Sequence, residues 1–436
     1  MQNLEPVTVT IHLPDPHKKQ VEFIDSKATR VVTVAGRRSG KTIAVSIMAV
    51  EAFLSGKRVL YAAPTQDQVD MFWRTVTRSL QEAIDAKIYY VNQTKHIVEL
   101  RGTEQRIRAK TAWSPDTLRG DYADLLILDE FQMMSEDTWG LVGLPMLLDN
   151  NGKAVFIYTP PSLRTIGKSK AKDPQHASHM YKKAKAEEAK AAEAGTESRW
   201  AGFHFTSHDN PYISEVALAD IVSDMSSLAY RQEILAEDVD EAPGALWHNA
   251  DIEALRVWDA PDMDQIVVGV DPSASSGGDE AGVIVCGRKN GVLYILDDMS
   301  IQGSPTQWAN QAIKAYHKWK ANLIVAEKNN GGEMVSLTIG TVDKSVPVEL
   351  VWSSRGKQLR AEPISVVYEK KMAHHVGNFP FLEAEMTLWQ PGDSNSPNRL
   401  DAMVFSATKL MVNAGPSASE WLAALKKKNA EAEAGY

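Results

Sequence analysis

The sequence predicts two α/β domains, the first with a doubly wound, mostly parallel sheet and the second with a mixed sheet. Three observations predict this division. Four nearly continuous apolar runs alternate with amphipathic helical patterns between residues 30 and 160, a stretch of acids and prolines follows at 237–264, and a second group of strand patterns begins at residue 265. Such apolar runs are expected of parallel strands that are covered on both faces. A chain of 436 residues is long enough for two domains of ordinary size.

The boundaries that we expect follow these changes in composition. They are 1–160 for the core of the first domain, 161–240 for a helical lid and linker subdomain, 241–262 for an interdomain linker, 263–415 for the second domain and 416–436 for a C-terminal tail. Within the first domain, the alternating patterns of residues 88–100 and 104–112 predict an antiparallel excursion at the sheet edge. In the second, three antiparallel strands, a helix and a parallel strand are predicted, with a hairpin turn at Lys289, Asn290 and Gly291.

Composition excludes several classes of protein. No apolar run approaches the roughly 20 residues that span a bilayer, and the N-terminus does not read as a secretory signal. Cys286 is the only cysteine, which excludes an intrachain disulfide and a thiolate zinc cluster and fits a reducing cytosol. The net charge of −9 argues against a surface coated with basic residues, so any nucleic acid is expected to bind in a local groove.

A phosphate-binding loop is predicted where the apolar run 30–35 leads through GRRSGKT, residues 36–42, into a helix. In such a loop the backbone N–H groups and the helix N-terminus bind phosphates. We expect Lys41 to reach the β and γ phosphates of ATP and the Thr42 hydroxyl to bind Mg²⁺. Ala35 stands where the usual pattern has its first glycine. The residues expected to bind the nucleotide are Arg37, Arg38, Ser39, Gly40, Lys41 and Thr42.

Two acids complete this predicted site. The run LLILDE, residues 125–130, ends at the edge of the sheet where open α/β folds bind their ligands. We expect Asp129 to hold Mg²⁺, directly or through water, and Glu130 to polarise the water that attacks ATP. The other interpretation is that two acids merely end a buried strand.

Two further residues have less specific signals. A guanidinium inside the loop can offset charge on the transferring phosphoryl group, and Arg37 is the preferred candidate, although a plain DNA or surface contact is the alternative. Gln20 lies 21 residues before Lys41 and could read the adenine edge. A lone glutamine after two lysines is equally compatible with the surface of a helix.

A second acidic site is predicted in the second domain. Asp271 and Glu327 end apolar strands, and Asp401 falls in the first turn of a helical pattern. Carboxylates are the ligands that hard divalent ions prefer, so we expect these three to bind two Mg²⁺ or Mn²⁺ ions for phosphodiester cleavage. Asp279 is a candidate fourth or outer ligand. Acids at strand ends are common, and each of these acids alone favours a structural role. The three together, in the order of strands and acids seen in ribonuclease H-like nucleases, favour the metal site.

A local basic groove is the last candidate feature of the second domain. The side chains that could form it are Lys357, Arg360, Lys370 and Lys371, with His374 and His375 beside them. An ordinary solvated surface is the alternative, and no His or Cys spacing suggests zinc.

Eight segments in order resemble the large terminase subunit family of tailed bacteriophages. AGRRSGKT, YAAPT, LRGDYADLLILDE and YTPPS resemble its motor domain, and GVDPSASSGGDEAGV, VAEKNNGG, RAEPISVVYEKKMAHHVG and SPNRLDAMVFSATKL resemble its nuclease domain. The resemblance implies a P-loop ATPase fused to a ribonuclease H-like nuclease, in which an arginine-bearing loop without its first glycine is common. It also implies that Thr159 and Pro160 form the motif that couples hydrolysis to motion, and that Arg119 is a finger acting on a neighbouring subunit's ATP.

The same resemblance implies a DNA-packaging motor and its partners. These are double-stranded DNA, a portal protein, a small terminase subunit and further copies of the chain in a ring, expected to be a pentamer, with no membrane. The expected location is the cytoplasm of the bacterial host cell and, transiently, the procapsid. The alternative is a helicase or repair ATPase fused to a nuclease and not tied to a capsid, which predicts a second motor-like domain or a strand-separating element. A third alternative is an ATP-binding scaffold with a decayed nuclease, against which the intact acids argue.

Overall fold

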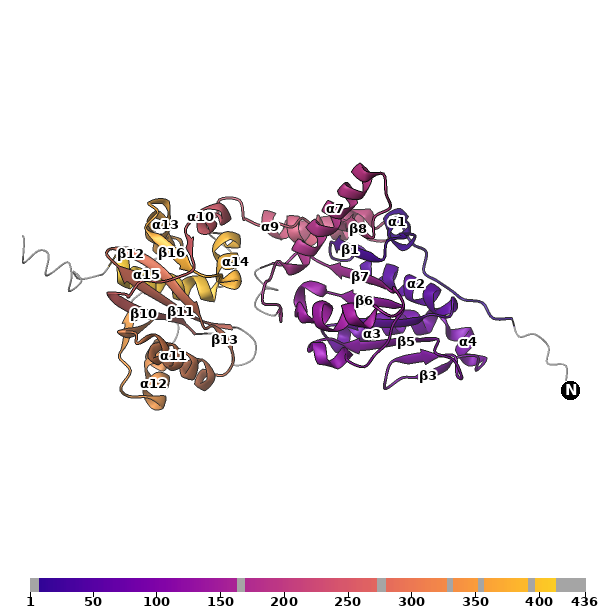
Figure 1. Ribbon diagram of the computed structural model, residues 1–436, viewed down its shortest axis with the longest axis horizontal. Coiled ribbons are helices and arrows are strands. Elements are labelled where there is room, and N and C mark those ends of the chain that lie inside the picture. The colour runs from indigo at the N-terminus through magenta and orange to yellow at the C-terminus, as the bar shows by residue number, and fades with distance from the viewer. Residues whose placement is uncertain are drawn as a thin grey trace, which may run out of the picture. The chain divides into compact units, whose positions relative to one another are not determined.

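The computed structural model describes residues 8–162, 169–272, 280–327, 332–351, 357–390 and 397–412. The chain divides into two compact units, Met1–Val239 and Asp240–Tyr436, which are drawn in Figure 1 and described separately below. No helix in the described ranges is both long enough and apolar enough to cross a membrane.

The first unit is built on a mostly parallel sheet. In the described part of the chain this sheet has eight strands, in the order β3 (Tyr90–Asn92), β4 (Ile97–Glu99), β5 (Arg106–Thr111), β2 (Arg58–Ala63), β6 (Leu125–Asp129), β7 (Lys153–Tyr158), β1 (Arg30–Ala35) and β8 (Trp200–Phe205). The strands from β5 to β8 pair in parallel, whereas β3, β4 and β5 pair antiparallel at one edge. The predicted doubly wound sheet and its antiparallel edge are therefore confirmed.

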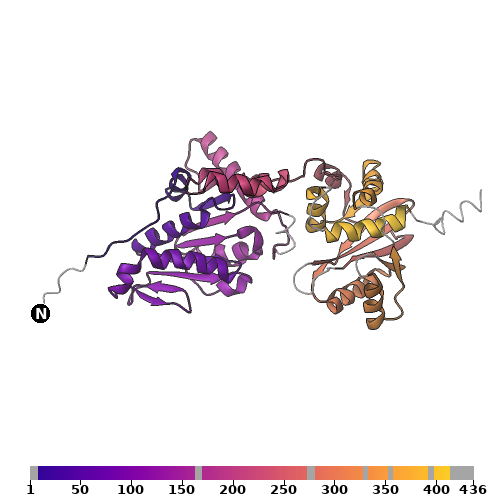
Figure 2. The ribbon, with the colours of Figure 1, turned by 180° about the vertical axis from the view of Figure 1, so that it is seen from behind.

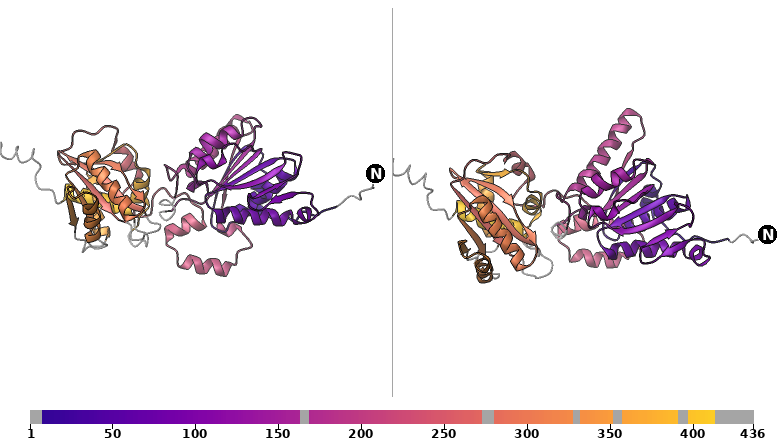
Figure 3. Two further views of the ribbon diagram at one scale, coloured as in Figure 1. Left: turned by 90° about the horizontal axis from the view of Figure 1, so that it is seen from below. Right: turned by 60° about the horizontal axis from the view of Figure 1, so that its bottom comes forward.

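Helices cover both faces of this sheet, as the views in Figures 2 and 3 show. One face packs on α2 (Lys41–Leu54) and α3 (Gln66–Ser79), and the other on α7 (His176–Ala194) and the short turn η2 (Phe131–Met133). The remaining short elements are α1 (Lys18–Ile24), α4 (Gln81–Asp85), η1 (Pro115–Leu118), η3 (Thr138–Gly143), α5 (Leu144–Met146), η4 (Ser207–Asp209), α8 (Glu215–Ser223), α9 (Ser227–Ala229) and η5 (Tyr230–Ile234). Burial on both faces explains why the central strands are almost continuously apolar between their ends.

The segment 161–240, expected to be helical and polar, also contributes strand β8 to the sheet. β8 pairs in parallel with β1, and its residues alternate irregularly between buried and partly exposed. Its sequence, WAGFHF, contains glycine and histidine and lacks the continuous apolar run of a central strand. β8 is the edge strand of the sheet, with a neighbouring strand among the described residues on one side only. An edge strand is less enclosed than a central strand and therefore does not need a continuous apolar run. The polar helix that was expected in this segment is α7, which carries ion pairs such as Lys185 to Glu188.

The second unit is built on a mixed sheet, as predicted. Its strand order in the described ranges is β15 (Val348–Val351), β14 (Leu323–Glu327), β10 (Gln265–Asp271), β11 (Glu280–Lys289), β12 (Val292–Asp298), β16 (Ala373–Val376) and β9 (Arg256–Val257), with β13 (Ile301–Gln302) beside β11. Strands β10, β11 and β12 are antiparallel, and β14 is parallel to β10. The hairpin turn has positive φ at Asn290 and Gly291, 50° and 79°, which matches the twist of the two strands it joins.

Helices also cover both faces of the second sheet. Trp308 of α11 (Pro305–Trp319) and Val335 of α12 (Gly332–Val342) are buried in the core on one face. Helix α15 (Asn398–Met411) packs on β10 and β11 from the other face and is seen in yellow across the strands in Figure 2. The other helices are α10 (Asn249–Ala254), α13 (Lys357–Glu369) and α14 (Pro380–Leu388).

Part of the segment expected to be an interdomain linker, 241–262, lies in the second unit's fold. It forms α10 and strand β9, which pairs with β16. Trp247 is buried, whereas Trp258 is exposed. Isolated tryptophans without periodicity favour a linker in the sequence, but Trp247 is buried in the second unit. A sequence pattern without periodicity does not show which tryptophan is buried and which is exposed.

Candidate active sites

The predicted phosphate-binding loop connects β1 to α2. Gly40 precedes the first residue of α2 and has φ +88°, a conformation that L side chains rarely adopt. A Cβ atom at Gly40 would also lie 2.5 Å from Gln20 Nε2. A side chain at this position would be strained by the positive φ angle and would also displace the Gln20 amide.

Lys41 lies between two residues at the ends of neighbouring strands. Its Nζ atom is 2.6 Å from Oε1 of Glu130, which follows β6, and it donates a hydrogen bond to Oγ1 of Thr159, which follows β7. Strands β6, β7 and β1 are adjacent and parallel, so their carboxyl ends meet at one edge. The structure thus brings together Lys41, Glu130 and Thr159, as the predicted site requires.

Asp129 lies beside the hydroxyl that was predicted to share a metal with it. Thr42 Oγ1 donates to Asp129 Oδ2 at 2.9 Å, and Tyr61 OH donates to the same oxygen at 2.8 Å. The other oxygen, Oδ1, is buried and has no hydrogen-bond partner in the described ranges. A buried carboxylate oxygen without a donor, next to a threonine hydroxyl, fits a Mg²⁺ ligand.

The two acids of this site have opposite pKa shifts. Burial and the charge of Glu130 raise the pKa of Asp129 to about 6, although Lys41 acts in the opposite direction. Burial also raises the pKa of Glu130, but the charge and hydrogen bond of Lys41, helped by a hydrogen bond from Gln132, lower it below its ordinary value. At neutral pH both acids are therefore ionised, and Asp129 is the more easily protonated.

Gln20 lies beneath the loop and not on a helix surface. Its side chain is buried; its Nε2 donates to the Gly40 carbonyl at 2.8 Å, and its Oε1 accepts from the backbone N–H of His17 at 2.8 Å. The surface interpretation of Gln20 is thus wrong. His17 Nε2 forms a further hydrogen bond with the Ser39 carbonyl at 2.9 Å. Both side chains support the backbone of the loop, and a role of Gln20 in binding adenine stays a prediction.

The arginines of the loop differ in their contacts. Arg37 forms an ion pair with Glu233 of η5, through hydrogen bonds from both Nε and Nη2. Arg38 has φ +60°, and its carbonyl accepts a hydrogen bond from Asn210 at 2.6 Å. Ser39 is buried. Arg119 lies apart from the loop contacts described above: it is exposed and pairs with Asp116 at 2.7 Å.

The predicted nuclease acids occupy equivalent positions on neighbouring strands. Val270 of β10 pairs with Ala326 of β14, so Asp271 and Glu327 each follow a paired residue. Both are buried. Because Val270 and Ala326 point into the core beneath α11, the next side chain on each strand points to the opposite face, which α15 covers.

Helix α15 reaches this face because two strand residues are glycine. A Cβ atom at Gly269 would lie 1.9 Å from the carbonyl oxygen of Ala402, and one at Gly282 would lie 2.0 Å from that of Asn398. The first turn of α15 is therefore in backbone contact with the sheet. This contact carries Asp401, which is also buried, to the side of Asp271.

The three carboxylates share one electrostatic environment with two cations. Burial and the charges of Asp401 and Glu327 raise the pKa of Asp271 well above its ordinary value, against the effect of Lys357 and Arg360. Burial, helped by Glu327, likewise raises the pKa of Asp401, again opposed by the two cations.

Both cations also contact the acids directly. Lys357 Nζ lies 2.5 Å from Asp401 Oδ2, and Arg360 Nη1 lies 3.4 Å from Glu327 Oε1. Buried acids that raise one another's pKa and attract cations have the chemistry of a divalent metal site.

The carboxylates do not form a ready-made metal cage. The described ranges contain no group of three or more His, Cys, Asp or Glu side chains arranged to hold a metal ion. Asp279 lies outside the described residues. The three carboxylates have the chemistry and the negative charge that a divalent ion needs. In this structure Lys357 and Arg360 balance that negative charge.

The expected basic groove is only partly present. Lys357 and Arg360 contact the acids, but His375 is fully buried and bonds to Tyr368 at 2.8 Å and to Glu383 at 2.9 Å. The expectation that His375 lies at a basic surface is therefore wrong. Its position on the short strand β16 explains the burial, and a two-histidine pattern in the sequence does not reveal which of them faces the core.

Several residues around these sites were not predicted. They are His17, Tyr61, Gln132, Ser207, Asn210, Glu233, Gly269 and Gly282. Tyr61 begins the motif YAAPT, which could have marked it. Glu233 lies in a segment without any motif, so no sequence signal connects it with Arg37.

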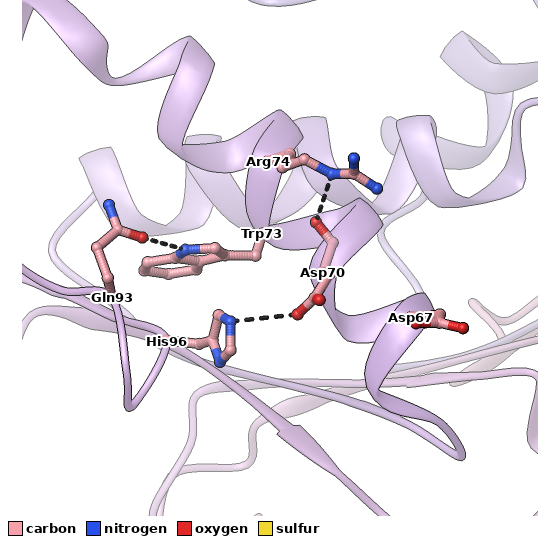
Figure 4. A pocket seen from close by; sticks show the side chains of 6 residues that line it. All are labelled: Asp67, Asp70, Trp73, Arg74, Gln93 and His96. Carbon is pink, nitrogen blue, oxygen red and sulfur yellow. Dashed lines mark hydrogen bonds and ion pairs between the residues drawn. The ribbon is translucent and has the colours of Figure 1, made fainter.

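A separate pocket of about 540 Å³ lies between α3 and the turn that joins β3 and β4, as Figure 4 shows. Its lining side chains largely satisfy one another: Asp70 pairs with His96 at 3.3 Å, and Trp73 donates to Gln93 at 2.7 Å. None of the predicted site residues lines it.

Comparison with known proteins gives two family matches. A model described as the ATPase domain of the terminase large subunit matches residues 24–164, and one described as the terminase RNaseH-like domain matches residues 268–427. The terminase large subunit of Thermus virus P23-45 is 31% identical over 166 residues, which cover 34% of this chain and 34% of that protein. The matched stretch thus spans about a third of the length of this curated relative.

Solved structures of large terminases are also similar. The ATPase domain of the Thermus phage P74-26 large terminase is 24% identical, with 52% of this chain and 94% of that chain covered and a TM-score of 0.41. The large terminase of bacteriophage HK97 is 11% identical, with 91% and 95% covered and a TM-score of 0.44. The two family models match the two structural units in turn, and the chain accordingly belongs to the terminase large subunit family.

Proposed function

We propose that this chain is the motor and nuclease of a viral DNA-packaging machine. ATP hydrolysis in the first unit drives double-stranded DNA through a portal into a procapsid, and a metal-dependent endonuclease in the second unit cuts concatemeric DNA at the start and end of each round. The observation that carries the proposal is that each of the two family matches coincides with its own cluster of largely buried acids paired with cations.

The contacts of Lys41 support the ATPase assignment. When ATP binds, its β and γ phosphates attract the Lys41 ammonium, which then releases Glu130 from their 2.6 Å ion pair. Burial raises the pKa of Glu130, but Lys41 lowers it below its ordinary value, so Glu130 is ionised and can orient and polarise the attacking water. Thr159 loses its hydrogen bond from Lys41 in the same step, which is how the residue after β7 would sense the nucleotide.

Thr42 and Asp129 would hold a magnesium ion, which would supply positive charge to neutralise the negative charge that develops during phosphoryl transfer. The unpartnered Oδ1 atom of Asp129 supports this role. Arg37 supplies further positive charge near the γ phosphate, and Arg38, Ser39 and Gly40 present the backbone of the loop.

The shared environment of Asp271, Glu327 and Asp401 supports the nuclease assignment. These three would hold two Mg²⁺ or Mn²⁺ ions, with Asp279 as a further ligand, and the ions would activate water and stabilise the leaving 3′ oxygen. Lys357 and Arg360 balance the negative charge of the acids. Once metal ions neutralise the acids, these two cations would be able to bind the phosphates of DNA.

The assembly of the machine follows from the same proposal. Arg119 is exposed, which suits a finger that completes the ATP site of a neighbouring copy in a ring, expected to be a pentamer on the portal. A small terminase subunit would select the DNA. The motor would work in the cytoplasm of the bacterial host, transiently bound to the procapsid.

The test is to measure ATP hydrolysis and plasmid cleavage by the purified chain, with and without the cognate portal and small subunit. We expect both activities, a requirement of each for divalent metal, and stimulation of hydrolysis by the partners together with DNA. Hydrolysis stimulated by DNA ends or forks alone, with strand separation and no response to the portal, would instead favour a helicase or repair enzyme.

A further inference from the structure

The side chain of Gln132 is buried beside the candidate catalytic acid of the first unit. Gln132 is 3% exposed, and its Nε2 atom donates to Oε2 of Glu130 at 2.7 Å. Its Oε1 atom is also buried and has no hydrogen-bond partner within the described ranges. Burying an amide with one of its two polar atoms unsatisfied costs free energy. Such a cost next to a catalytic acid indicates that the hydrogen bond to Glu130 has a function.

Glu130 has a backbone conformation that its surroundings must maintain. Its φ and ψ angles are 54° and 45°, in the left-handed region that residues other than glycine rarely adopt. A residue in this region keeps its conformation only where neighbouring contacts hold it. The backbone N–H of Met133 donates to the Glu130 carbonyl at 2.9 Å, which closes the turn η2 and places Gln132 beside the acid.

The turn that carries Gln132 is fixed by the core and by a segment far along the chain. Phe131 is fully buried. Ser169 Oγ donates to the Gln132 carbonyl at 2.8 Å, and the backbone N–H of Lys170 donates to the Met133 carbonyl at 3.0 Å. The backbone of Gln132 is therefore held in place, so its amide can fix the orientation of a neighbouring carboxylate.

The two oxygens of the Glu130 carboxylate have different partners. Oε1 lies 2.6 Å from Lys41 Nζ, whereas Oε2 accepts the hydrogen bond from Gln132. The phosphates of ATP attract the Lys41 ammonium, so the acid loses this partner when the nucleotide binds. The amide of Gln132 is neutral and is not drawn to the phosphates in this way. Its hydrogen bond to Glu130 therefore persists while the nucleotide is bound.

We propose that Gln132 is a positioning residue that keeps the Glu130 carboxylate oriented towards the attacking water after Lys41 has turned to the phosphates. Gln132 acts through Glu130, so it contributes to the rate of hydrolysis and not to the affinity for ATP. Without this hydrogen bond the carboxylate rotates more freely and polarises the water in fewer of its orientations. This inference rests on the proposed ATPase function of the first unit.

The variant Gln132→Met tests the amide group. Methionine has nearly the length and shape of glutamine but cannot donate a hydrogen bond to a carboxylate. The matched control is Gln105→Met, because Gln105 Nε2 also donates a hydrogen bond, to the Phe53 carbonyl at 2.6 Å. Gln105 precedes β5, at the amino ends of the parallel strands, whereas Glu130 lies at their carboxyl ends. The control therefore loses an equivalent hydrogen bond away from the site.

The readouts are kcat and KM for ATP, together with the dissociation constant of ATPγS measured by displacement of a fluorescent nucleotide. In Gln132→Met we expect kcat to fall about tenfold, with KM and the ATPγS constant changed by less than about twofold. Gln105→Met should keep kcat within about twofold of the wild type. In a Glu130→Ala background, Gln132→Met should cause no further loss of kcat, because the group that it positions is gone.

A purely structural role for Gln132 predicts a different pattern. The fall in kcat is then accompanied by weaker binding of ATPγS and occurs again in the Glu130→Ala background. That result overturns the inference, as does an unchanged kcat in Gln132→Met.

If Gln132→Met does not fold, Gln132→Asn provides the test. It keeps an amide on a side chain that is one carbon shorter, and it should lower kcat by a smaller factor at unchanged KM. An unchanged kcat in this variant counts equally against the inference. A wild-type chain that does not hydrolyse ATP refutes the proposed ATPase function instead.

Discussion

Asp271 lies directly opposite Gly282 in the antiparallel register of β10 and β11. The side chain that Gly282 lacks would occupy the position of the Asn398 backbone, since a Cβ atom there would be 2.0 Å from its carbonyl oxygen. The helix that carries Asp401 can therefore approach the strand that carries Asp271. The absence of a side chain at Gly282 is therefore what allows the acids of the second site to lie close together.

Gly282→Ala should separate α15 from the sheet. The clash is with backbone atoms, which cannot rotate away, so we expect a loss of about 2 kcal/mol or more in the free energy of unfolding and a loss of plasmid cleavage. Gly340→Ala in α12 is the control, because a Cβ atom there meets nothing within 4 Å and alanine favours a helix by about 0.5 to 1 kcal/mol. Urea unfolding of both variants measures this; equal stabilities would contradict the packing described.

Glu130→Ala should separate nucleotide binding from hydrolysis. The loop and Lys41 remain, so ATP still binds, but water is no longer polarised and turnover falls at least about a hundredfold. Steady-state ATPase assays and nucleotide binding on the same preparation give the two quantities. Turnover close to that of the wild type would remove Glu130 from its catalytic role.

Asp271→Ala should have the opposite selectivity. It removes an acid from the centre of the predicted metal site, so plasmid cleavage is lost while ATP hydrolysis is retained. Asp343→Asn is a control in the same unit, because Asp343 is an acid paired with His317 on a different helix. Cleavage by the wild type should stop in EDTA and return with Mg²⁺ or Mn²⁺. Cleavage that persists in Asp271→Ala would exclude this residue from the site.

Asp129 predicts a dependence of stability on pH. Burial and Glu130 raise the pKa of Asp129 to about 6 in the folded chain, above its ordinary value of 3.8, so the folded state binds the proton more tightly than the unfolded state. Ionised Asp129 therefore destabilises the fold, and this penalty grows as pH rises from the unfolded value through about 6.

The variant Asp129→Asn removes that penalty and keeps an oxygen for Thr42 and Tyr61. Its melting temperature should exceed that of the wild type at pH 8, and the difference should shrink as pH falls to 4. A difference that is independent of pH would contradict the assigned cause. ATP hydrolysis by the wild type should also decline below pH 6, because protonated Asp129 cannot serve as a metal ligand.

Cys286 should be inert in the folded chain. It is fully buried, its Sγ accepts a hydrogen bond from Ser406 Oγ at 3.0 Å, and burial raises its pKa to about 12. Because the thiolate is the reactive form, a thiol reagent should modify the chain only in denaturant. Rapid labelling of the native chain would show that α15 does not pack on β11 as described.

The sequence was sufficient where a local pattern determines the structure. Continuous apolar runs identified the central strands of both sheets, and the residues at their carboxyl ends, such as Asp129 and Asp271, could be named because strand ends converge at one edge. The phosphate-binding loop was also recognisable from a local pattern, because Gly40 and Lys41 are neighbours in the sequence at the start of α2.

Contacts between distant segments could not be predicted in this way. β8 lacks the pattern of a central strand, Trp247 belongs to the core of the second unit, and Glu233 reaches Arg37 across 196 positions. Gly282 looks like any other glycine in the sequence, and only the approach of α15 shows why a side chain is excluded. Tertiary packing, which pattern and propensity do not encode, determines each of these features.

The most direct test of the packaging function uses procapsids that carry the cognate portal, linear DNA and the purified chain. After nuclease digestion of unprotected DNA, we expect protected DNA only with ATP, none with Glu130→Ala, and full protection with Asp271→Ala, because precut DNA needs no cleavage. Failure of the wild type to protect DNA in a reaction where it hydrolyses ATP and binds the portal would contradict the assignment as a packaging motor.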